Sequence, residues 1–242
     1  MWNACDLSFS CLRYSVLALS TEGTECVAIR HPSWWVIPMQ AIVALVEEIT
    51  DVVRRAVSRR RVRHILNDRK DISIEVGAGN RKGREGWITI DVTRCCDIYW
   101  DVRKGLPFPD GCASRIYSSH CLEHLSFPEG QKFLTECLRV LVSGGTFSIC
   151  VPNARMYIDS YLGYVPLESR LFYPPAFNNT TRIDYVNYMA YMNGLHKYMF
   201  DEENLLHVLE ARGFRNVRRR GFEPQLDLEM RDYESIYAEA EK

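Results

Sequence analysis

The chain has 242 residues, of which 47% are hydrophobic and 25% are charged, with 30 Lys and Arg against 31 Asp and Glu. This composition is typical of a globular protein and excludes collagen-like and intrinsically disordered chains. The net charge of −1 excludes a global field that would attract nucleic acid, so such a partner would have to be recognised by a local patch.

The cysteines argue against a disulfide or zinc framework. There are nine, an odd number, and no pair has the C-x-x-C spacing. We therefore predict reduced thiols and a cytoplasmic protein. The adjacent Cys95 and Cys96 have no further cysteine or histidine at a metal-ligand spacing, so no metal ligands are predicted.

The longest apolar run, residues 34–46, is interrupted by Pro38 and Gln40. It falls short of the roughly 20 residues that cross a bilayer, and the N-terminus lacks the basic region of a secretory leader. We expect no transmembrane span and leave open a contact with a membrane surface.

Residues 1–70 are predicted to be an N-terminal extension. Residues 1–37 show no clear period and could be an appendage or an interface. From Met39 to about Asn67, apolar residues recur every three or four positions, which predicts one long amphipathic helix or two short ones. Its arginine run from Arg54 to Arg63 is either a solvated helix face or a patch for anionic lipid, phosphate or polynucleotide.

From residue 71 onward, strand and helix patterns alternate. Such alternation requires a mostly parallel sheet with helices on both faces, a doubly wound α/β fold. A helix is predicted over Pro128–Val142, ended by Gly144 and Gly145. The predicted strands are Ile72–Val76, Trp87–Val92, Asp97–Val102, Arg115–Ser119 and Thr146–Val151.

The C-terminal part begins with an insert and then resumes the pattern. Residues 153–200 are dense in tyrosine and methionine, and we predict short helices and loops that form a helical lid. Asp201 is expected to cap a helix that runs to about Arg212. Strands over Phe214–Arg220 and Tyr233–Ala240 would complete a mostly parallel seven-stranded sheet.

Gly77 and Gly79 follow the first predicted strand. Glycines at a strand-to-loop turn let the backbone approach a ligand closely and adopt positive φ. The dinucleotide fingerprint needs a third glycine and a later acidic residue, but Gly83 is one position late and Asp91 comes only 14 residues after Gly77. This spacing argues against NAD and favours a different nucleoside ligand.

Carboxylates lie at or near the ends of the first three predicted strands. Asp91 could accept hydrogen bonds from both ribose hydroxyls, Asp101 could accept one from an adenine amino group, and Glu75 would lie beneath the ligand. Any one of them alone would be read as a solvated turn or a helix cap. Together, beside the glycine pair, they predict a nucleoside site.

Several segments in this order resemble the class I S-adenosylmethionine-dependent methyltransferases. They are IEVGAGNRKGREGWITIDV, DIYWDVRKGLPFPDG, IYSSHCLEHL, FLTECLRVLVSGGTFSICVPN, HKYMFDEENLLHVLEARGFRNV and YESIYAEAEK. The resemblance is strongest to a branch common in polysaccharide and natural-product biosynthesis. It implies a Rossmann-like methyltransferase domain over residues 71–242, with S-adenosylmethionine as methyl donor and S-adenosylhomocysteine as product.

The resemblance also implies a set of cofactor-binding residues. Asp91 would hold the ribose, Asp101 the adenine amino group, and Val102 one face of the adenine. Ser119 and His120 would form the floor under the sulfonium. The full set is Glu75, Gly77, Ala78, Gly79, Asp91, Val92, Asp101, Val102, Ser119 and His120.

Methyl transfer needs a base if the acceptor is a hydroxyl or a protonated amine. His120 is the preferred general base, because imidazole titrates near neutral pH and this position faces the methyl donor. His196 is a second candidate. For Glu123 and His124 the alternative is that they cap or brace the following helix.

The tyrosines of the insert have two interpretations. They form a small second core, or some of them line an acceptor lid, with Tyr157, Tyr191 and Tyr198 as candidates.

The sequence thus predicts methyl transfer to an oxygen or nitrogen of a small-molecule or glycan-like acceptor. One alternative is an RNA methyltransferase, guided by Arg54–Arg63 together with Arg215 and Arg218–Arg220. Another is a binding or scaffold subunit that keeps the fold without turnover. A homodimer is left open.

Overall fold

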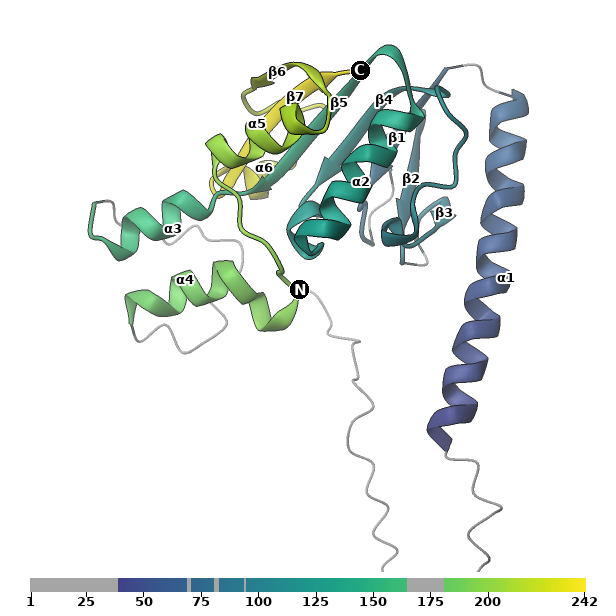
Figure 1. Cartoon of the computed structure of the whole chain (residues 1–242), viewed down its shortest axis with the longest axis horizontal. Coiled ribbons are helices and arrows are strands. Elements are labelled where there is room, and N and C mark those ends of the chain that lie inside the picture. The colour runs from purple at the N-terminus through teal and green to yellow at the C-terminus, as the bar shows by residue number, and fades with distance from the viewer. Residues whose placement is uncertain (1–38, 69–70, 81–82, 94, 165–180) are drawn as a thin grey trace, which may run out of the picture. The chain divides into compact units, whose positions relative to one another are not determined.

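The computed structural model describes residues 39–68, 71–80, 83–93, 95–164 and 181–242 (Figure 1). The interpretation of residues 1–37 as an appendage or interface lies outside the described residues. Leu45–Lys242 form one compact unit, which contains the sheet and all the contacts considered below.

The unit is built on a seven-stranded sheet of order β3-β2-β1-β4-β5-β7-β6. Strands β1 to β5 pair in parallel, whereas β7 is antiparallel to both β5 and β6. This confirms the predicted doubly wound, mostly parallel seven-stranded fold. The strands are β1 (Ile72–Val76), β2 (Trp87–Asp91), β3 (Ile98–Tyr99), β4 (Ala113–Ser119), β5 (Leu141–Pro152), β6 (Arg215–Arg219) and β7 (Ser235–Glu241).

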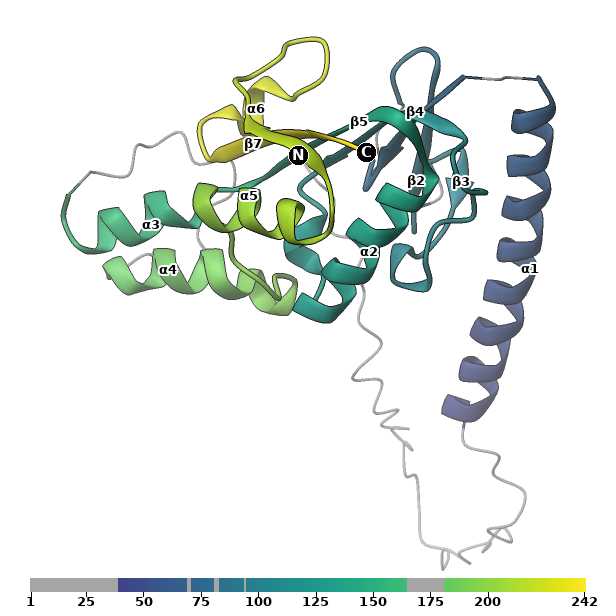
Figure 2. The ribbon, with the colours of Figure 1, turned by 45° about the horizontal axis from the view of Figure 1, so that its top comes forward.

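The central strands are covered on both faces, although in β1 the apolar residues alternate with the buried polar residues Ser73 and Glu75. All five residues of β1 are buried, as expected for a parallel strand covered from both sides. Helices α2 and α5 cover one face in both views (Figures 1 and 2). The helices are α1 (Met39–Asp68), α2 (Phe127–Val140), α3 (Ala154–Tyr161), α4 (Arg182–Tyr191), α5 (Glu202–Ala211) and α6 (Glu229–Asp232), with short 3-10 turns η2 (Val102–Lys104), η3 (Leu122–His124) and η4 (Met192–Gly194).

The N-terminal helix is one element, α1, and its apolar stripe is buried only near its end. Val62 is buried, and Ser58 Oγ donates a hydrogen bond of 2.8 Å to the carbonyl of Tyr99 in β3. Upstream, the apolar side chains from Leu45 to Val57 are 50% to 57% exposed. No helix among the described residues is long and apolar enough to cross a membrane.

The end of α2 differs from the prediction. The helix stops at Val140, and β5 begins at Leu141 and runs through Gly144 and Gly145. Ala113 pairs with Leu141 whereas Arg115 pairs with Thr146, so the extra residues form a bulge in β5. Gly144 has φ of +74°, and its amide donates to the carbonyl of Lys242. The glycines therefore shape a strand instead of ending a helix.

The third strand is shorter than the predicted Asp97–Val102. The Asp97 carboxylate accepts hydrogen bonds of 2.9 Å from both the amide and the hydroxyl of Thr89. Asp101 caps η2 by accepting from the amide of Arg103. These two side chains bracket Ile98–Tyr99 and end the ladder on either side.

Part of the predicted lid is a helical pair. Helices α3 and α4 pack together around a small core made of Ala154, Tyr157, Tyr188 and Met189. Residues 165–180 of the insert lie outside the described residues. The proposal that residues 153–200 form a lid is neither supported nor contradicted by this core.

Candidate active site

The glycine pair, Gly77 and Gly79, adopts the positive-φ backbone conformation predicted from the sequence. Gly77 has φ of +76° and Gly79 has φ of +64°, a region that side chains disfavour. A Cβ atom at Gly77 would lie 2.6 Å from Cβ of Cys121, which is shorter than any normal contact between two carbon atoms. The amide of Gly77 donates to the carbonyl of Ile90 at 2.9 Å. The loop therefore requires glycine at position 77 for two independent reasons.

Asp91, at the end of β2, holds the same loop. Its Oδ2 accepts a hydrogen bond of 2.9 Å from the amide of Gly79, and its Oδ1 accepts one of 3.0 Å from the amide of Thr93. The Thr93 hydroxyl donates to the carbonyl of Gly79 at 2.7 Å. A carboxylate fixed in this way keeps lone pairs available for ligand hydroxyls.

These elements border a cavity of about 370 Å³ at the carboxyl ends of β1, β2 and β4, which we call the strand-end pocket. In open α/β sheets, ligands bind outside the carboxyl ends of the strands, where the strand order reverses. Here the reversal lies between β1 and β4. The lining residues are Gly77, Gly79, Asp91, Val92, Trp100, Asp101, Val102, Arg103, His120, Cys121, His124, Leu125 and Arg231.

Three predicted cofactor residues lie behind the pocket instead of lining it. Glu75 is buried and forms an ion pair of 2.8 Å with Nη1 of Arg84. Ala78 is buried in the loop, and buried Ser119 accepts a hydrogen bond of 3.2 Å from Nη1 of Arg231. Glu75, Ala78 and Ser119 therefore lie in the layer beneath the residues that line the pocket.

At one end of the pocket, the Asp101 carboxylate forms an ion pair with Arg103. The Arg103 guanidinium donates to both carboxylate oxygens, at 2.9 Å from Nε and 2.8 Å from Nη2. Burial raises the pKa of Asp101, but these hydrogen bonds outweigh burial and hold the pKa below its usual value. An adenine amino group at this position would share the carboxylate with Arg103.

At the other end, His120 has a strained backbone, with φ of +50°. Such conformations in residues other than glycine are concentrated at functional sites. Ser235 donates its hydroxyl proton to the carbonyl of Arg231 at 2.6 Å, so its oxygen accepts from Nε2 of His120 at 2.8 Å. In a neutral His120, Nδ1 is then the basic nitrogen. It lies 3.7 Å from Oε1 of Glu123.

His196 does not line the strand-end pocket. It is buried, and its Nδ1 donates to the carbonyl of Met189 at 2.7 Å. Burial lowers the pKa of His196 to about 4. This imidazole is neutral at pH 7 and too weakly basic to be an effective general base, so the structure argues against that predicted role.

Glu123 and His124 do not cap α2, contrary to one reading of the sequence. The cap is Ser126, whose amide and hydroxyl both donate to Glu129. Glu123 instead offers its main-chain carbonyl to the amides of Lys197 at 2.8 Å and Tyr198 at 3.2 Å. It braces the segment that closes the insert.

The three candidate tyrosines do not line the strand-end pocket either. Tyr157 is buried, and its hydroxyl donates to Glu234 at 2.7 Å. The Tyr198 ring packs against Phe127 and Phe200, and Tyr191 is 60% exposed. Tyr157 thus belongs to the small second core, whereas Tyr198 packs against the main core of the sheet.

Sequence reasoning missed six lining residues: Trp100, Arg103, Cys121, His124, Leu125 and Arg231. Arg231 lies in α6, 112 positions after Ser119, to which it donates a hydrogen bond. No local sequence motif therefore predicts its place in the pocket. Its Nε is buried and has no hydrogen-bond partner among the described residues. It is a donor with capacity for an anionic ligand.

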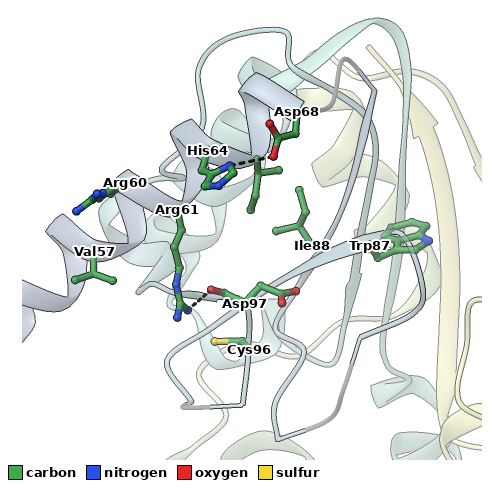
Figure 3. A pocket seen from close by; sticks show the side chains of 10 residues that line it. Val57, Arg60, Arg61, His64, Asp68, Trp87, Ile88, Cys96 and Asp97 are labelled. Carbon is green, nitrogen blue, oxygen red and sulfur yellow. Dashed lines mark hydrogen bonds and ion pairs between the residues drawn. The ribbon is translucent and has the colours of Figure 1, made fainter.

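A larger hollow of about 750 Å³ lies between the C-terminal half of α1 and the start of β2 (Figure 3). There His64 pairs with Asp68 at 3.0 Å, and Arg61 donates to the carbonyl of Asp97 at 2.9 Å. Trp87, at the amino end of β2, lines it. Because parallel sheets bind ligands at their carboxyl ends, the smaller strand-end pocket is the candidate active site.

Comparison with known proteins agrees with this geometry. Residues 74–149, which span β1 to β5 and carry the glycine loop, match the family model described as a methyltransferase domain. Over these residues the chain is similar to a methyltransferase domain. The match supports the predicted resemblance to methyltransferases over this stretch, whereas the predicted extent of the domain, residues 71–242, stays a prediction.

The ajmaline N-methyltransferase of Rauvolfia serpentina is 30% identical over 102 residues, which cover 42% of this chain and 32% of that protein. The matched region thus spans about a third of the length of this curated relative. Among solved structures, a methyltransferase from Archaeoglobus fulgidus shares 18% identity with a TM-score of 0.45, covering 78% of this chain and 94% of that one. The phosphoethanolamine N-methyltransferase 2 of Haemonchus contortus shares 9% identity with a TM-score of 0.45, covering 71% and 48%.

Proposed function

We propose that this protein transfers a methyl group from S-adenosylmethionine to a small-molecule or glycan-like acceptor. The observation that carries the proposal is the strand-end pocket, where the glycine loop and Asp91 meet inside the methyltransferase domain. Its volume of about 370 Å³ is within the range of small-molecule and cofactor sites. The relative from Rauvolfia is named as an N-methyltransferase, which supports a nitrogen acceptor without deciding between nitrogen and oxygen.

The donor would lie across the pocket from Asp101 to His120. Asp91 would accept hydrogen bonds from the ribose hydroxyls, Val102 would contact the adenine, and Asp101 would accept from its amino group. Arg231 would bind the carboxylate of the methionine portion, because its buried Nε is a charged donor with no partner in the described chain.

His120 is the group we assign to proton removal when the acceptor is a hydroxyl or a protonated amine. Its Nε2–H is held by Ser235, so Nδ1 would take the proton. The ring is held in one orientation, which favours a productive geometry. A neutral amine acceptor would attack the methyl carbon without this step.

The RNA alternative depends on two arginine runs forming one surface, and they lie at opposite edges of the sheet. The run in α1 contacts β3, where Arg54 stacks on the Tyr99 ring at 4.7 Å, whereas the second run lies on β6. Six interstrand spacings of about 4.8 Å separate these edges, roughly 29 Å. Arg218 pairs with Glu239, and Arg220 pairs with buried Asp227. These arginines are largely used within the domain.

The test is a methyl-transfer screen with radiolabelled S-adenosylmethionine over amine, sugar, lipid-linked and RNA acceptors. We expect transfer to a small or sugar-containing acceptor. With a hydroxyl acceptor, His120→Asn should reduce the rate by about 10²–10⁴-fold. His207→Asn, at an exposed position in α5, is the matched control. Transfer to RNA alone would establish the alternative, and absence of both transfer and donor binding would indicate a scaffold subunit.

A further inference from the structure

Glu123, His124 and His196 come together beside the strand-end pocket. One ligand atom from each, a carboxylate oxygen or an imidazole nitrogen, lies within 4.8 Å of the other two. The rings of His124 and His196 meet edge to face with their centroids 5.0 Å apart. Two imidazoles and one carboxylate are a donor set that first-row transition metals prefer.

Both imidazoles are oriented as metal ligands usually are. Nδ1 of His124 lies 3.1 Å from the carbonyl of Leu195, and Nδ1 of His196 lies 2.7 Å from the carbonyl of Met189. A carbonyl can only accept, so each Nδ1 carries the proton and each Nε2 offers a lone pair. Backbone carbonyls that fix the tautomer in this way are a recurrent feature around metal-bound histidines.

The buried carboxylate of Glu123 lacks hydrogen-bond partners within the described part of the chain. Glu123 is 2% exposed, and neither side-chain oxygen has a hydrogen-bond partner among the residues that the structure describes. Nε2 of His124 and Nδ1 of His120 each lie 3.7 Å from Oε1, too far for a hydrogen bond. Buried polar atoms of this kind are rare in native proteins and call for a partner.

The main chain holds the two segments together. The amides of Lys197 and Tyr198 both donate to the carbonyl of Glu123, and the amide of His196 donates to the carbonyl of Tyr191. These bonds place His196 beside η3 although 72 positions separate it from His124. The donor set is therefore assembled by the fold before any ion arrives.

We propose that Glu123, His124 and His196 bind one divalent transition metal of the zinc type. Three protein ligands would leave a fourth position open for water or for an acceptor atom. His124 also lines the strand-end pocket, so the open position would lie next to the methyl acceptor. That placement rests on the proposed methyltransferase function, whereas metal binding itself does not.

The experiment is titration of the chelator-treated 242-residue chain with Zn²⁺, followed by Co²⁺ absorption spectroscopy. We expect one ion per chain, and a Co²⁺ spectrum of a four-coordinate nitrogen and oxygen site without thiolate charge-transfer bands. His196→Ala should weaken Zn²⁺ binding by about 100-fold or more. His207→Ala should not change it. Glu123→Gln, which keeps the side-chain volume, provides a second variant if His196→Ala fails to fold.

Absence of stoichiometric Zn²⁺ binding would overturn the inference, as would thiolate bands or an affinity unchanged in both His196→Ala and Glu123→Gln. Titration of the same samples with S-adenosylhomocysteine separates the two claims. If S-adenosylhomocysteine binds and Zn²⁺ does not, the metal site fails and the proposed function stands. If Zn²⁺ binds and S-adenosylhomocysteine does not, the metal site stands and the proposed function fails.

Discussion

The two ends of the strand-end pocket differ in how their polar groups are satisfied. At the end formed by Asp91 and Asp101, both carboxylates accept hydrogen bonds from loop amides, and Asp101 also pairs with Arg103. At the opposite end, Nε of Arg231 has no partner among the described residues, and neither do the two side-chain oxygens of Glu123 beside that end. The first end is complete before a ligand binds, whereas the second requires a ligand or an ion to compensate its buried polar groups.

This difference assigns separate tasks to the two ends. The complete end would provide a rigid surface for the proposed nucleoside, because its carboxylates accept hydrogen bonds from neighbouring backbone amides before any ligand binds. The incomplete end contains the strained His120 and borders the cluster of Glu123, His124 and His196, and these are the groups suited to chemistry. Substitutions at the complete end should change both the unfolding free energy and the affinity for the nucleoside. Substitutions at the incomplete end should mainly change the affinity for the ligand or ion that compensates its buried polar groups.

The largest effect is expected from Gly77→Ala at the complete end. The added Cβ would strain the positive φ and overlap Cys121, at a combined cost of about 2–5 kcal/mol in unfolding free energy. Gly79→Ala is the matched control, because it has a similar φ but no atom within 4 Å of the new Cβ, so we expect about 1–2 kcal/mol. Denaturant unfolding measures both. Equal losses would show that the contact with Cys121 is unimportant.

At the incomplete end, Arg231→Met should weaken binding of S-adenosylhomocysteine by about 10–100-fold, because a charged hydrogen bond to the ligand carboxylate contributes about 1.5–3 kcal/mol. Isothermal titration calorimetry measures the affinity. Methylthioadenosine lacks that carboxylate, so its affinity should be the same for Arg231→Met and the parent protein. A parallel loss for both ligands would place Arg231 in a structural role.

Behind the complete end, Glu136 supplies a pH-dependent contribution to stability. Hydrogen bonds from Arg139 and, at 2.8 Å, from the amide of Leu106 lower the pKa of Glu136 in the folded state, against an opposing effect of burial. A carboxyl whose pKa is lowered by folding stabilises the protein above its unfolded pKa, about 4.3, and loses this contribution as pH falls through the folded value.

Glu136→Gln should therefore lower the unfolding free energy by about 1.5 kcal/mol at pH 7, and the difference should shrink below about pH 4.3. Denaturant unfolding at several pH values measures it. A difference that is constant with pH, or that grows on acidification, would contradict this account of Glu136.

The smallest expected effect is a gain in affinity for S-adenosylhomocysteine in Arg103→Gln, whereas Arg231→Met should lose affinity. Arg103 and the proposed adenine amino group would share Asp101, so Arg103→Gln should leave Asp101 more available. Because this ion pair is half exposed on the arginine side, we expect S-adenosylhomocysteine to bind up to about 5-fold more tightly, equivalent to 0.2–1 kcal/mol. Arg55→Gln, which breaks a pair with Asp51 in α1, is the control. Weaker binding of the Arg103 variant would show that Arg103 itself contacts the ligand.

The two ends also differ in how far they could be predicted from the sequence. Gly77, Gly79 and Asp91 lie within 15 positions, so their spacing and strand-end context reveal the nucleoside end. Arg231 reaches the other end through α6, more than 110 positions after Ser119, and main-chain hydrogen bonds bring His196 beside that end, more than 70 positions after His124. Helix-like spacing in α1 predicted the helix but not that its apolar residues before Val57 are exposed, because exposure depends on what packs against them.

Calorimetric titration with S-adenosylhomocysteine, comparing the parent protein with Asp91→Asn, tests the central claim most directly. Asn preserves the shape of the side chain but removes its charge and one acceptor. We predict binding at one site per chain, weakened about 10–100-fold in Asp91→Asn. Absence of binding to the parent protein, or equal affinity in both, would contradict the assignment of the strand-end pocket as the methyl-donor site.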